Sequence, residues 1–138
     1  MGPQQELFTA IMTTLLSCLP CRVYDGALPP SGVSYPFVYM GETMQSDIQN
    51  KSCVGGTVIQ TIHVWSDKPT MRGELSDIID QITTWIRRLP KRTFSFELKK
   101  LNTRILYDDV ESQGKGGAVL MHGIVNCTFE FSPVDGEQ

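Results

Sequence analysis

The residue pair whose spacing most suggests chemistry is Cys18 and Cys21, because two residues separate them. This C-x-x-C spacing occurs in redox sites and in zinc sites. A redox pair normally opens a helix, where the helix dipole lowers the thiol pKa, whereas this pair closes a predicted helix. A structural zinc ion needs four ligands, and Cys53, Cys127 and the histidines are not paired at short spacing. We interpret the four cysteines as free, mostly buried thiols and expect no metal or cofactor.

The two histidines, His63 and His122, are candidates for acid–base chemistry because a histidine titrates near neutral pH. A general base needs a nucleophile or an orienting carboxylate within hydrogen-bond reach. The chain contains no G-x-S-x-G motif that would supply the nucleophile. We therefore interpret both as strand histidines that hydrogen-bond on a sheet, and we predict no enzymatic activity.

A glycine-rich segment, Gly114-Lys115-Gly116-Gly117, invites comparison with phosphate-binding loops. A P-loop has the pattern G-x-x-x-x-G-K-[ST] and joins a strand to a helix. Here no Ser or Thr follows Lys115, and the flanking segments both have strand character. The segment is better interpreted as a hairpin tip at residues 113–117, where an exposed Lys115 could contact a neighbouring protein.

The composition bounds the class of protein. A chain of 138 residues with 41% hydrophobic residues fits one domain with one core. The formal net charge of -3 gives no overall nucleic-acid footprint, and no apolar run approaches the roughly 20 residues that span a bilayer. We expect a single domain over residues 1–138, ordered from about 5 to 131, with a frayed tail at 132–138. It is expected to be made in a reducing cytoplasm and to bind neither membranes nor specific nucleic acid.

In the first half, apolar residues spaced by three and four predict a helix at about residues 4–19, ended by Pro20. Strands are predicted at residues 22–25 and 37–42. The polar segment 44–56 is predicted to be a long loop. The next strand, 57–65, is apolar on both faces, so it is a central strand covered on both sides or covered by a partner subunit.

In the second half, a wide apolar stripe predicts a helix at about residues 71–89. Phe94, Phe96 and Leu98 alternate, and the residues from Leu101 onward alternate in the opposite phase, which predicts a bulge near Lys99. The final strand, 119–131, alternates most regularly. The fold class is therefore α+β: one antiparallel or mixed sheet of about 5–6 strands with two amphipathic helices packed on one face.

The ordered segments of residues 23–66 resemble a known family. Val23-Tyr24-Asp25-Gly26 precedes a proline-containing loop and Tyr35-Pro36-Phe37-Val38-Tyr39-Met40-Gly41-Glu42, and after the polar segment comes Thr61-Ile62-His63-Val64-Trp65-Ser66. This set resembles the tail-completion, or tail-terminator, proteins of long-tailed bacteriophages. The element order matches over residues 5–131, and the specific words cover only residues 23–66.

The resemblance implies a structural protein of the virion. Members of the family cap the completed tail tube, stop its polymerisation and join the tail to the head connector. They are expected to act as a ring, with a hexamer as the expected stoichiometry. The implied partners are copies of the same chain, the tail-tube protein and the head connector or head-completion protein, and the implied location is the head–tail interface.

Two further segments are candidates for partner binding. The polar segment contributes Gln45, Ser46, Asp47 and Lys51, either as a solvated connection or as an assembly loop that orders against a neighbour. The basic cluster contributes Arg87, Arg88, Lys91 and Arg92. This cluster is either a solvated helix end that complements the helix dipole or a contact for an acidic patch on a neighbouring subunit. Tight contacts with DNA passing through a channel are disfavoured, because many phosphate contacts would hold the genome fast.

Two other functions stay open at this stage. One is a head-closure or neck subunit of the same virion. The other, from a different class, is a small cytoplasmic enzyme or ligand-binding α+β domain, which would need a pocket with converging polar groups.

Overall fold

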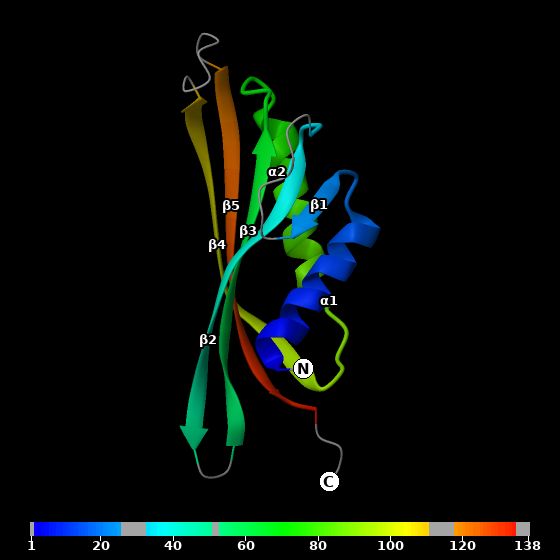
Figure 1. Ribbon diagram of the computed structural model, residues 1–138, viewed down its shortest axis with the longest axis vertical. Helices are drawn as coiled ribbons and strands as arrows, with labels where there is room; N and C mark the ends of the chain where they lie inside the picture. Colours follow the sequence, from blue (N-terminus) through cyan, green and yellow to red (C-terminus); the bar gives the residue numbers. More distant parts are fainter. Residues whose placement is uncertain (1, 26–32, 51–52, 111–117, 135–138) are drawn as a thin grey trace.

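The computed structural model describes residues 2–25, 33–50, 53–110 and 118–134 (Figure 1). The elements in chain order are α1 (Pro3–Cys18), β1 (Arg22–Asp25), β2 (Phe37–Asn50), β3 (Cys53–Ser66), α2 (Arg72–Ile86), β4 (Phe94–Val110) and β5 (Ala118–Pro133). The five strands form one sheet in the order β1-β2-β3-β5-β4. β1 is parallel to β2 and the other neighbours are antiparallel, which makes the sheet mixed and confirms the α+β fold class.

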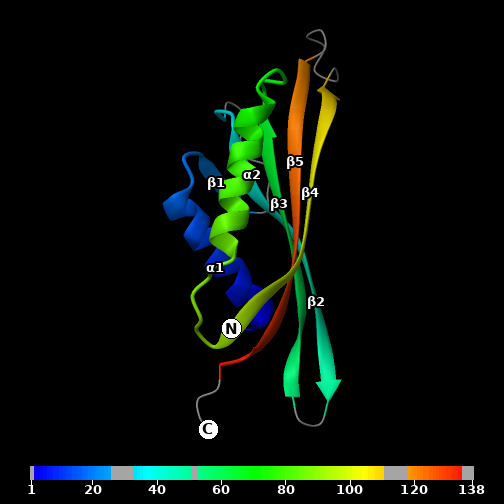
Figure 2. The ribbon, with the colours of Figure 1, turned by 180° about the vertical axis from the view of Figure 1, so that it is seen from behind.

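Both helices pack on the same face of the sheet, as Figure 2 shows. On α2 the buried positions recur every three or four residues, so a single stripe faces the sheet. Its members are Leu75, Ile78, Ile79, Ile82 and Ile86. The helix comes unusually close to β5 at Gly123, where a Cβ atom would lie 2.9 Å from Cδ1 of Ile79. A glycine at this position therefore sets the helix–sheet distance.

The helix ends follow the prolines. α1 stops at Cys18 because Leu19, which precedes Pro20, adopts an extended backbone with φ -87° and ψ 150°. α2 ends at Ile86, three residues before the predicted end at Leu89. The basic cluster at residues 87–92 therefore follows the helix and does not form its last turn.

The central strand is β3, as predicted, but the two helices cover only one of its faces. Val58, Ile62 and Val64 are buried in the core beneath the helices. Ile59 and Trp65 lie on the opposite face and are only partly buried. No described helix or strand packs over this opposite face, which we call the second face.

The prediction of a long loop at residues 44–56 is wrong. β2 and β3 stay paired from Met44↔Ile59 out to Asn50↔Cys53, so only residues 51–52 lie between the strands. This hairpin extends past the helices at one end of the molecule (Figure 1). We call its residues 44–50 and 53–57 the arm. Because the arm has no helix to cover it, its side chains need no apolar alternation, and its polar sequence was taken for a loop.

The bulge predicted near Lys99 is confirmed. Leu98 pairs with Phe129 and Lys100 pairs with Thr128, so one residue of β4 is extra. The bulge changes the phase of β4, and both Leu98 before it and Leu101 after it pack against the core.

Glu6 on α1 is a buried acid that the sequence did not single out. Its side chain is 4% exposed, and its Oε2 accepts a hydrogen bond of 2.9 Å from the backbone N–H of Phe94. This contact satisfies a buried carboxylate and ties α1 to the first residue of β4.

Candidate interaction surface

The arm carries three of the predicted partner-binding residues, Gln45, Ser46 and Asp47. Gln45 Oε1 accepts a hydrogen bond of 3.1 Å from the backbone N–H of Gln4, which anchors the base of the arm to α1. Gln45 Nε2 donates to Asp47 Oδ1 at 2.8 Å. Ser46 and Asp47 are exposed. A fourth predicted residue, Lys51, lies outside the described residues.

The basic cluster is solvent-exposed at all four predicted positions, Arg87, Arg88, Lys91 and Arg92. It lies near the N-terminal end of α1, at the end of the molecule from which the arm projects (Figure 2). Within the described ranges, none of the four makes a salt bridge. The predicted contact residue Lys115 lies outside the described residues.

Cys18, Cys21 and Cys127 are free thiols, as predicted, whereas the side chain of Cys53 lies outside the described residues. Cys18 and Cys21 are partly buried at the C-terminal end of α1, and Cys127 is buried in the core. Burial raises the pKa of Cys21 and raises the pKa of Cys127 to about 12. Both thiols are protonated at neutral pH and are poor nucleophiles. In the described part of the chain, no three His, Cys, Asp or Glu side chains converge in a way that could hold a metal ion.

The two histidines meet on the second face, which sequence reasoning missed. Nδ1 of His63 lies 2.7 Å from Nε2 of His122, and Nδ1 of His122 lies 3.5 Å from Oδ2 of Asp108. Tyr39 stacks on His63 with ring centroids 4.5 Å apart, and Trp65 stacks on His122 at 3.8 Å. We call these five residues the histidine cluster. Asp108 is thus a carboxylate beside His122 that the sequence did not indicate.

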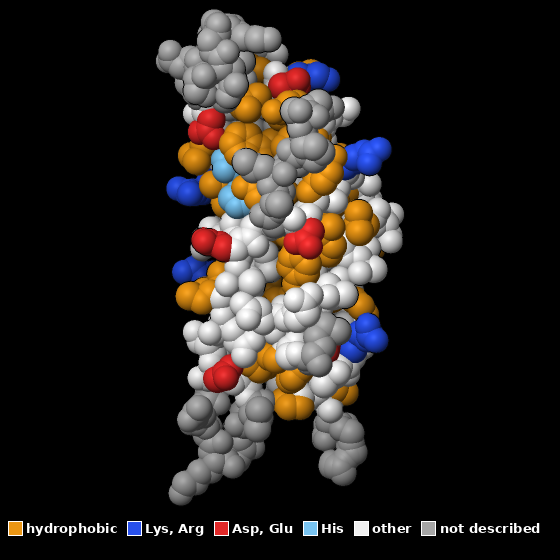
Figure 3. Space-filling model, viewed as in Figure 1, with side chains coloured by type: hydrophobic (Ala, Val, Ile, Leu, Met, Phe, Trp, Pro, Cys, Tyr) orange, Lys and Arg blue, Asp and Glu red, His pale blue; other side chains and the backbone are white. Residues whose placement is uncertain are grey.

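Strand register explains why the cluster was not predicted. β3 pairs with β5 so that Trp65 is opposite His122, which brings His63 next to it on the same face. Asp108 comes from β4 on the far side of β5. The alternation placed each residue on a face of its own strand, but only the pairing between strands brings them together. The pale-blue histidine side chains are visible among hydrophobic side chains in Figure 3.

The contacts of the cluster favour one pair of tautomers. Asp108 lies beside Nδ1 of His122 and favours a proton on that nitrogen, so Nε2 of His122 accepts the Nδ1–H of His63. Burial, and to a lesser extent repulsion from His122, lowers the pKa of His63 to about 4. Burial also lowers the pKa of His122, although Asp108 acts in the opposite direction. Both rings are therefore neutral at pH 7.

The backbone beside the cluster is shaped for His63. A Cβ atom on Gly41 would lie 2.7 Å from Cδ2 and Nε2 of that ring. A hollow of about 470 Å³ opens next to it, lined by Tyr39, Gly41, Glu42 and His63. Among the described residues, no hydroxyl or thiol hydrogen-bonds to either histidine. The two histidine rings are thus neutral and stack on Tyr39 and Trp65, and the described residues place no nucleophile in hydrogen-bond contact with them.

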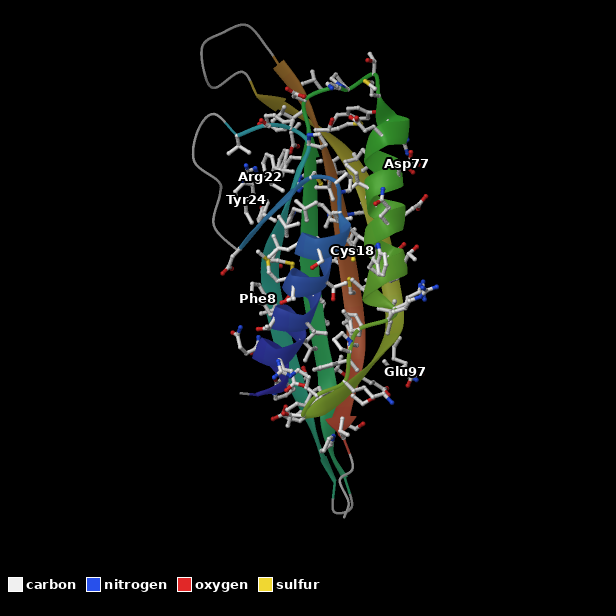
Figure 4. The ribbon with its side chains drawn as sticks, turned by 90° about the vertical axis from the view of Figure 1, so that its right-hand side faces the viewer. Phe8, Cys18, Arg22, Tyr24, Asp77 and Glu97 are labelled. Carbon is white, nitrogen blue, oxygen red and sulfur yellow. The ribbon has the colours of Figure 1, made fainter. Side chains whose placement is uncertain are left out.

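Another cavity lies between β1 and the first half of α2. It has a volume of about 650 Å³, and its lining includes Arg22 and Asp77, both labelled in Figure 4, together with Tyr35 and Glu74. One carboxylate oxygen of Glu74 is buried without a hydrogen-bond partner. The histidine cluster is not part of this cavity, so the acid–base groups and the enclosed volume are separate.

Lowering the pH from about 6.5 to about 4 is expected to reduce the free energy of unfolding. The pKa of His63 falls from 6.5 to about 4 on folding, so the unfolded chain takes up a proton that the folded chain does not. The loss begins below pH 6.5 and levels off below pH 4. His63→Phe should flatten this part of the profile, measured as thermal midpoint against pH. An unchanged profile in the variant would show that His63 is not the group responsible.

The described part of the chain has one sheet face covered by two helices, an opposite face that carries the stacked rings of the histidine cluster, and a projecting arm. No protein-family model matches the chain. It is 27% identical over 100 residues to the tail completion protein gp17 of Bacillus phage SPP1. The aligned region covers 71% of this chain and 69% of that protein. The solved structure of SPP1 gp17 superposes with a TM-score of 0.57 and 22% identity, covering 100% of this chain and 99% of gp17.

A second structural match comes from a virion. A chain of the native gene transfer agent particle superposes with a TM-score of 0.56 and 12% identity, covering 96% of this chain and 98% of that chain. At these identities the two superpositions establish the fold. Together with the sequence match they confirm the resemblance to the tail-completion proteins that residues 23–66 indicated.

Proposed function

We propose that this chain is a structural component of a phage tail that caps the completed tail tube, stops its polymerisation and joins the tail to the head connector. The observation that carries the proposal is the match to a tail completion protein over 71% of the chain. The same fold extends over the full length of both chains. The similarity also supports a location in the tail of the virion.

The surfaces of the molecule support a role in assembly. The outer edge of β4 has no neighbouring strand within the described residues, and the arm projects beyond the core. Both features suit contacts with other protein chains, because an exposed strand edge presents unpaired backbone N–H and C=O groups. The proposed partners are further copies of this chain in a ring, with six as the expected number, the tail-tube protein and the head connector.

The proposed role requires no chemistry. The relatives are structural tail proteins. The two histidines are neutral at pH 7, and among the described residues no nucleophile is hydrogen-bonded to them. The basic cluster at residues 87–92 and the exposed residues of the arm are the proposed contact points for partner proteins.

The proposal is tested by deleting the gene from the phage or prophage that carries it and examining the particles by electron microscopy. We expect tails of abnormal length, or tails that are not attached to heads, and restoration of normal particles by a wild-type copy supplied in trans. Tails of normal length that merely fail to attach would favour a head-closure subunit. Normal virions would refute a role in tail completion.

A further inference from the structure

The sheet has two free edges at opposite ends of its strand order. β1 pairs only with residues Phe37–Met40 of β2, so the outer edge of β2 beyond Met40 has no described neighbour. β4 is the last strand on the other side, and its outer edge is free along its length in the described part of the chain. Free edges of this length pair readily with another strand, so a native protein must cover or block them.

The two edges carry opposite charge. On the β2 edge, Glu42 and Asp47 are exposed carboxylates, and this stretch contains no cation. On the β4 edge, Lys100 and Arg104 are exposed cations four residues apart, and neither makes a salt bridge within the described residues. The neighbouring Lys99 differs, because its Nζ lies 3.3 Å from Glu97 and 3.9 Å from Glu130.

The matching charges also share a face of the sheet. Lys100 pairs with Thr128 and Arg104 with Ile124, and these partners lie on the second face together with His122. Glu42 lines the hollow beside His63, so it lies on the second face too. When two strands pair, side chains on the same face meet, so an added strand can bring Glu42 directly against Lys100.

Pairing between like edges is disfavoured. If two copies joined through β4 in antiparallel register around Asn102, Lys100 of each copy would oppose Arg104 of the other. If two copies joined through β2 in antiparallel register around Glu42, the Glu42 carboxylates of the two copies would oppose each other. Opposing like charges destabilise a strand pair, whereas the β2 edge against the β4 edge places opposite charges together.

We propose that the β2 edge of one copy, at residues 42–47, pairs with the β4 edge of a second copy, at residues 100–104, and continues the sheet from one subunit to the next. Each copy then uses a different edge toward each neighbour, which is the head-to-tail contact that generates closed rings. The inference rests on the proposed function, because it specifies how the proposed ring is built.

Charge reversal tests the pairing through a mixing experiment. Glu42→Lys alone places lysine against Lys100, and Lys100→Glu alone places glutamate against Glu42, so each variant alone should associate about tenfold or more weakly than wild type. In an equimolar mixture every contact between unlike chains is again complementary, so rings of alternating chains should form. Native mass spectrometry over a range of concentrations measures the association of each single variant and the formation of rings in the mixture. All these residues are exposed, so thermal midpoints should be unchanged.

A zero-length carbodiimide cross-link tests the same contact even if it is transient. Light and nitrogen-15-labelled wild-type chains are mixed, with and without tail tubes, and the peptide joining Glu42 to Lys100 is sought. β2 and β4 are separated by β3 and β5, roughly 14 Å, so a link within one chain is not expected. Lys100→Arg, which keeps the charge but not the amine, is the matched control that should lose the link.

The outcomes separate this inference from the proposed function. The pairing would be overturned if each single variant forms rings as well as wild type does. It would also be overturned if links between light and heavy chains form only at other sites. Either outcome leaves the capping role intact. The same holds if no link between Glu42 and Lys100 forms under any condition. If the wild-type chain forms rings through this contact but deletion of the gene leaves virions normal, the capping role fails and the pairing stands.

Discussion

Replacing Phe129 with alanine is expected to lower the free energy of unfolding by about 3–5 kcal/mol, the range found for large aromatic side chains in cores. Phe129 is 1% exposed and is the largest of the fully buried side chains. It lies on β5 between Val58 of β3 and Leu98 of β4, beneath the helices. Its removal leaves a cavity that neighbours on three strands cannot fill without moving.

The loss is measured by urea unfolding followed by tryptophan fluorescence, since Trp65 and Trp85 both lie in described elements. Leu106→Ala is the matched control on the same sheet. Its side chain is 37% exposed on the second face, so its truncation should change stability by no more than about 0.5 kcal/mol. Similar losses in both variants would mean that the covered face of the sheet is not the main source of stability.

The elements that face this core could be predicted from sequence. On α2 the apolar residues recur with the helical period, and on β5 they alternate, because each element has one face against the core and one away from it. The bulge at Lys99 was predictable for the same reason, since it restores the phase between Leu98 and Leu101. Because a buried face needs apolar side chains at regular positions, the regular spacing of apolar residues in the sequence indicates which face is buried.

Where burial is absent, the sequence is not informative. The arm is held by backbone pairing between β2 and β3, and backbone hydrogen bonds leave no mark on side-chain type. Its polar residues therefore gave the same signal as a loop. The histidine cluster was missed for a different reason. His63, His122 and Asp108 belong to three strands, and their contact depends on register between segments distant in the chain.

For the predicted contact residues, too, some properties follow from the local sequence and others only from the pairing of distant segments. Exposure of Arg87, Arg88, Lys91 and Arg92 follows from local charge density, and the structure places all four in solvent. That Glu42 and Lys100 have matching positions on opposite edges follows only from the strand order. Local sequence identifies which residues are available to partners, and topology determines which partners they can reach.

Shortening the arm is expected to abolish assembly while leaving the fold intact. Joining Ser46 to Thr57, which face each other across the hairpin, through an Asn-Gly turn removes residues 47–56 but keeps the buried Val58. Asn-Gly favours the type I′ turn that suits a two-residue hairpin connection. The core loses only the contact of Gly56 with Phe131 at its edge, so the thermal midpoint should shift by only a few degrees.

Assembly should respond very differently from stability. The shortened chain loses residues 47–50, the outer part of the β2 edge that includes Asp47, so we expect it to stay monomeric at concentrations where the wild-type chain forms rings, and to fail to rescue a deletion phage. The control is Asp47→Asn in a full-length arm, which keeps the backbone edge and should weaken association only partly. Native mass spectrometry measures ring formation, and virion counts measure rescue of the deletion phage. A shortened chain that assembles and rescues as well as wild type would show that the arm is not used in building the tail.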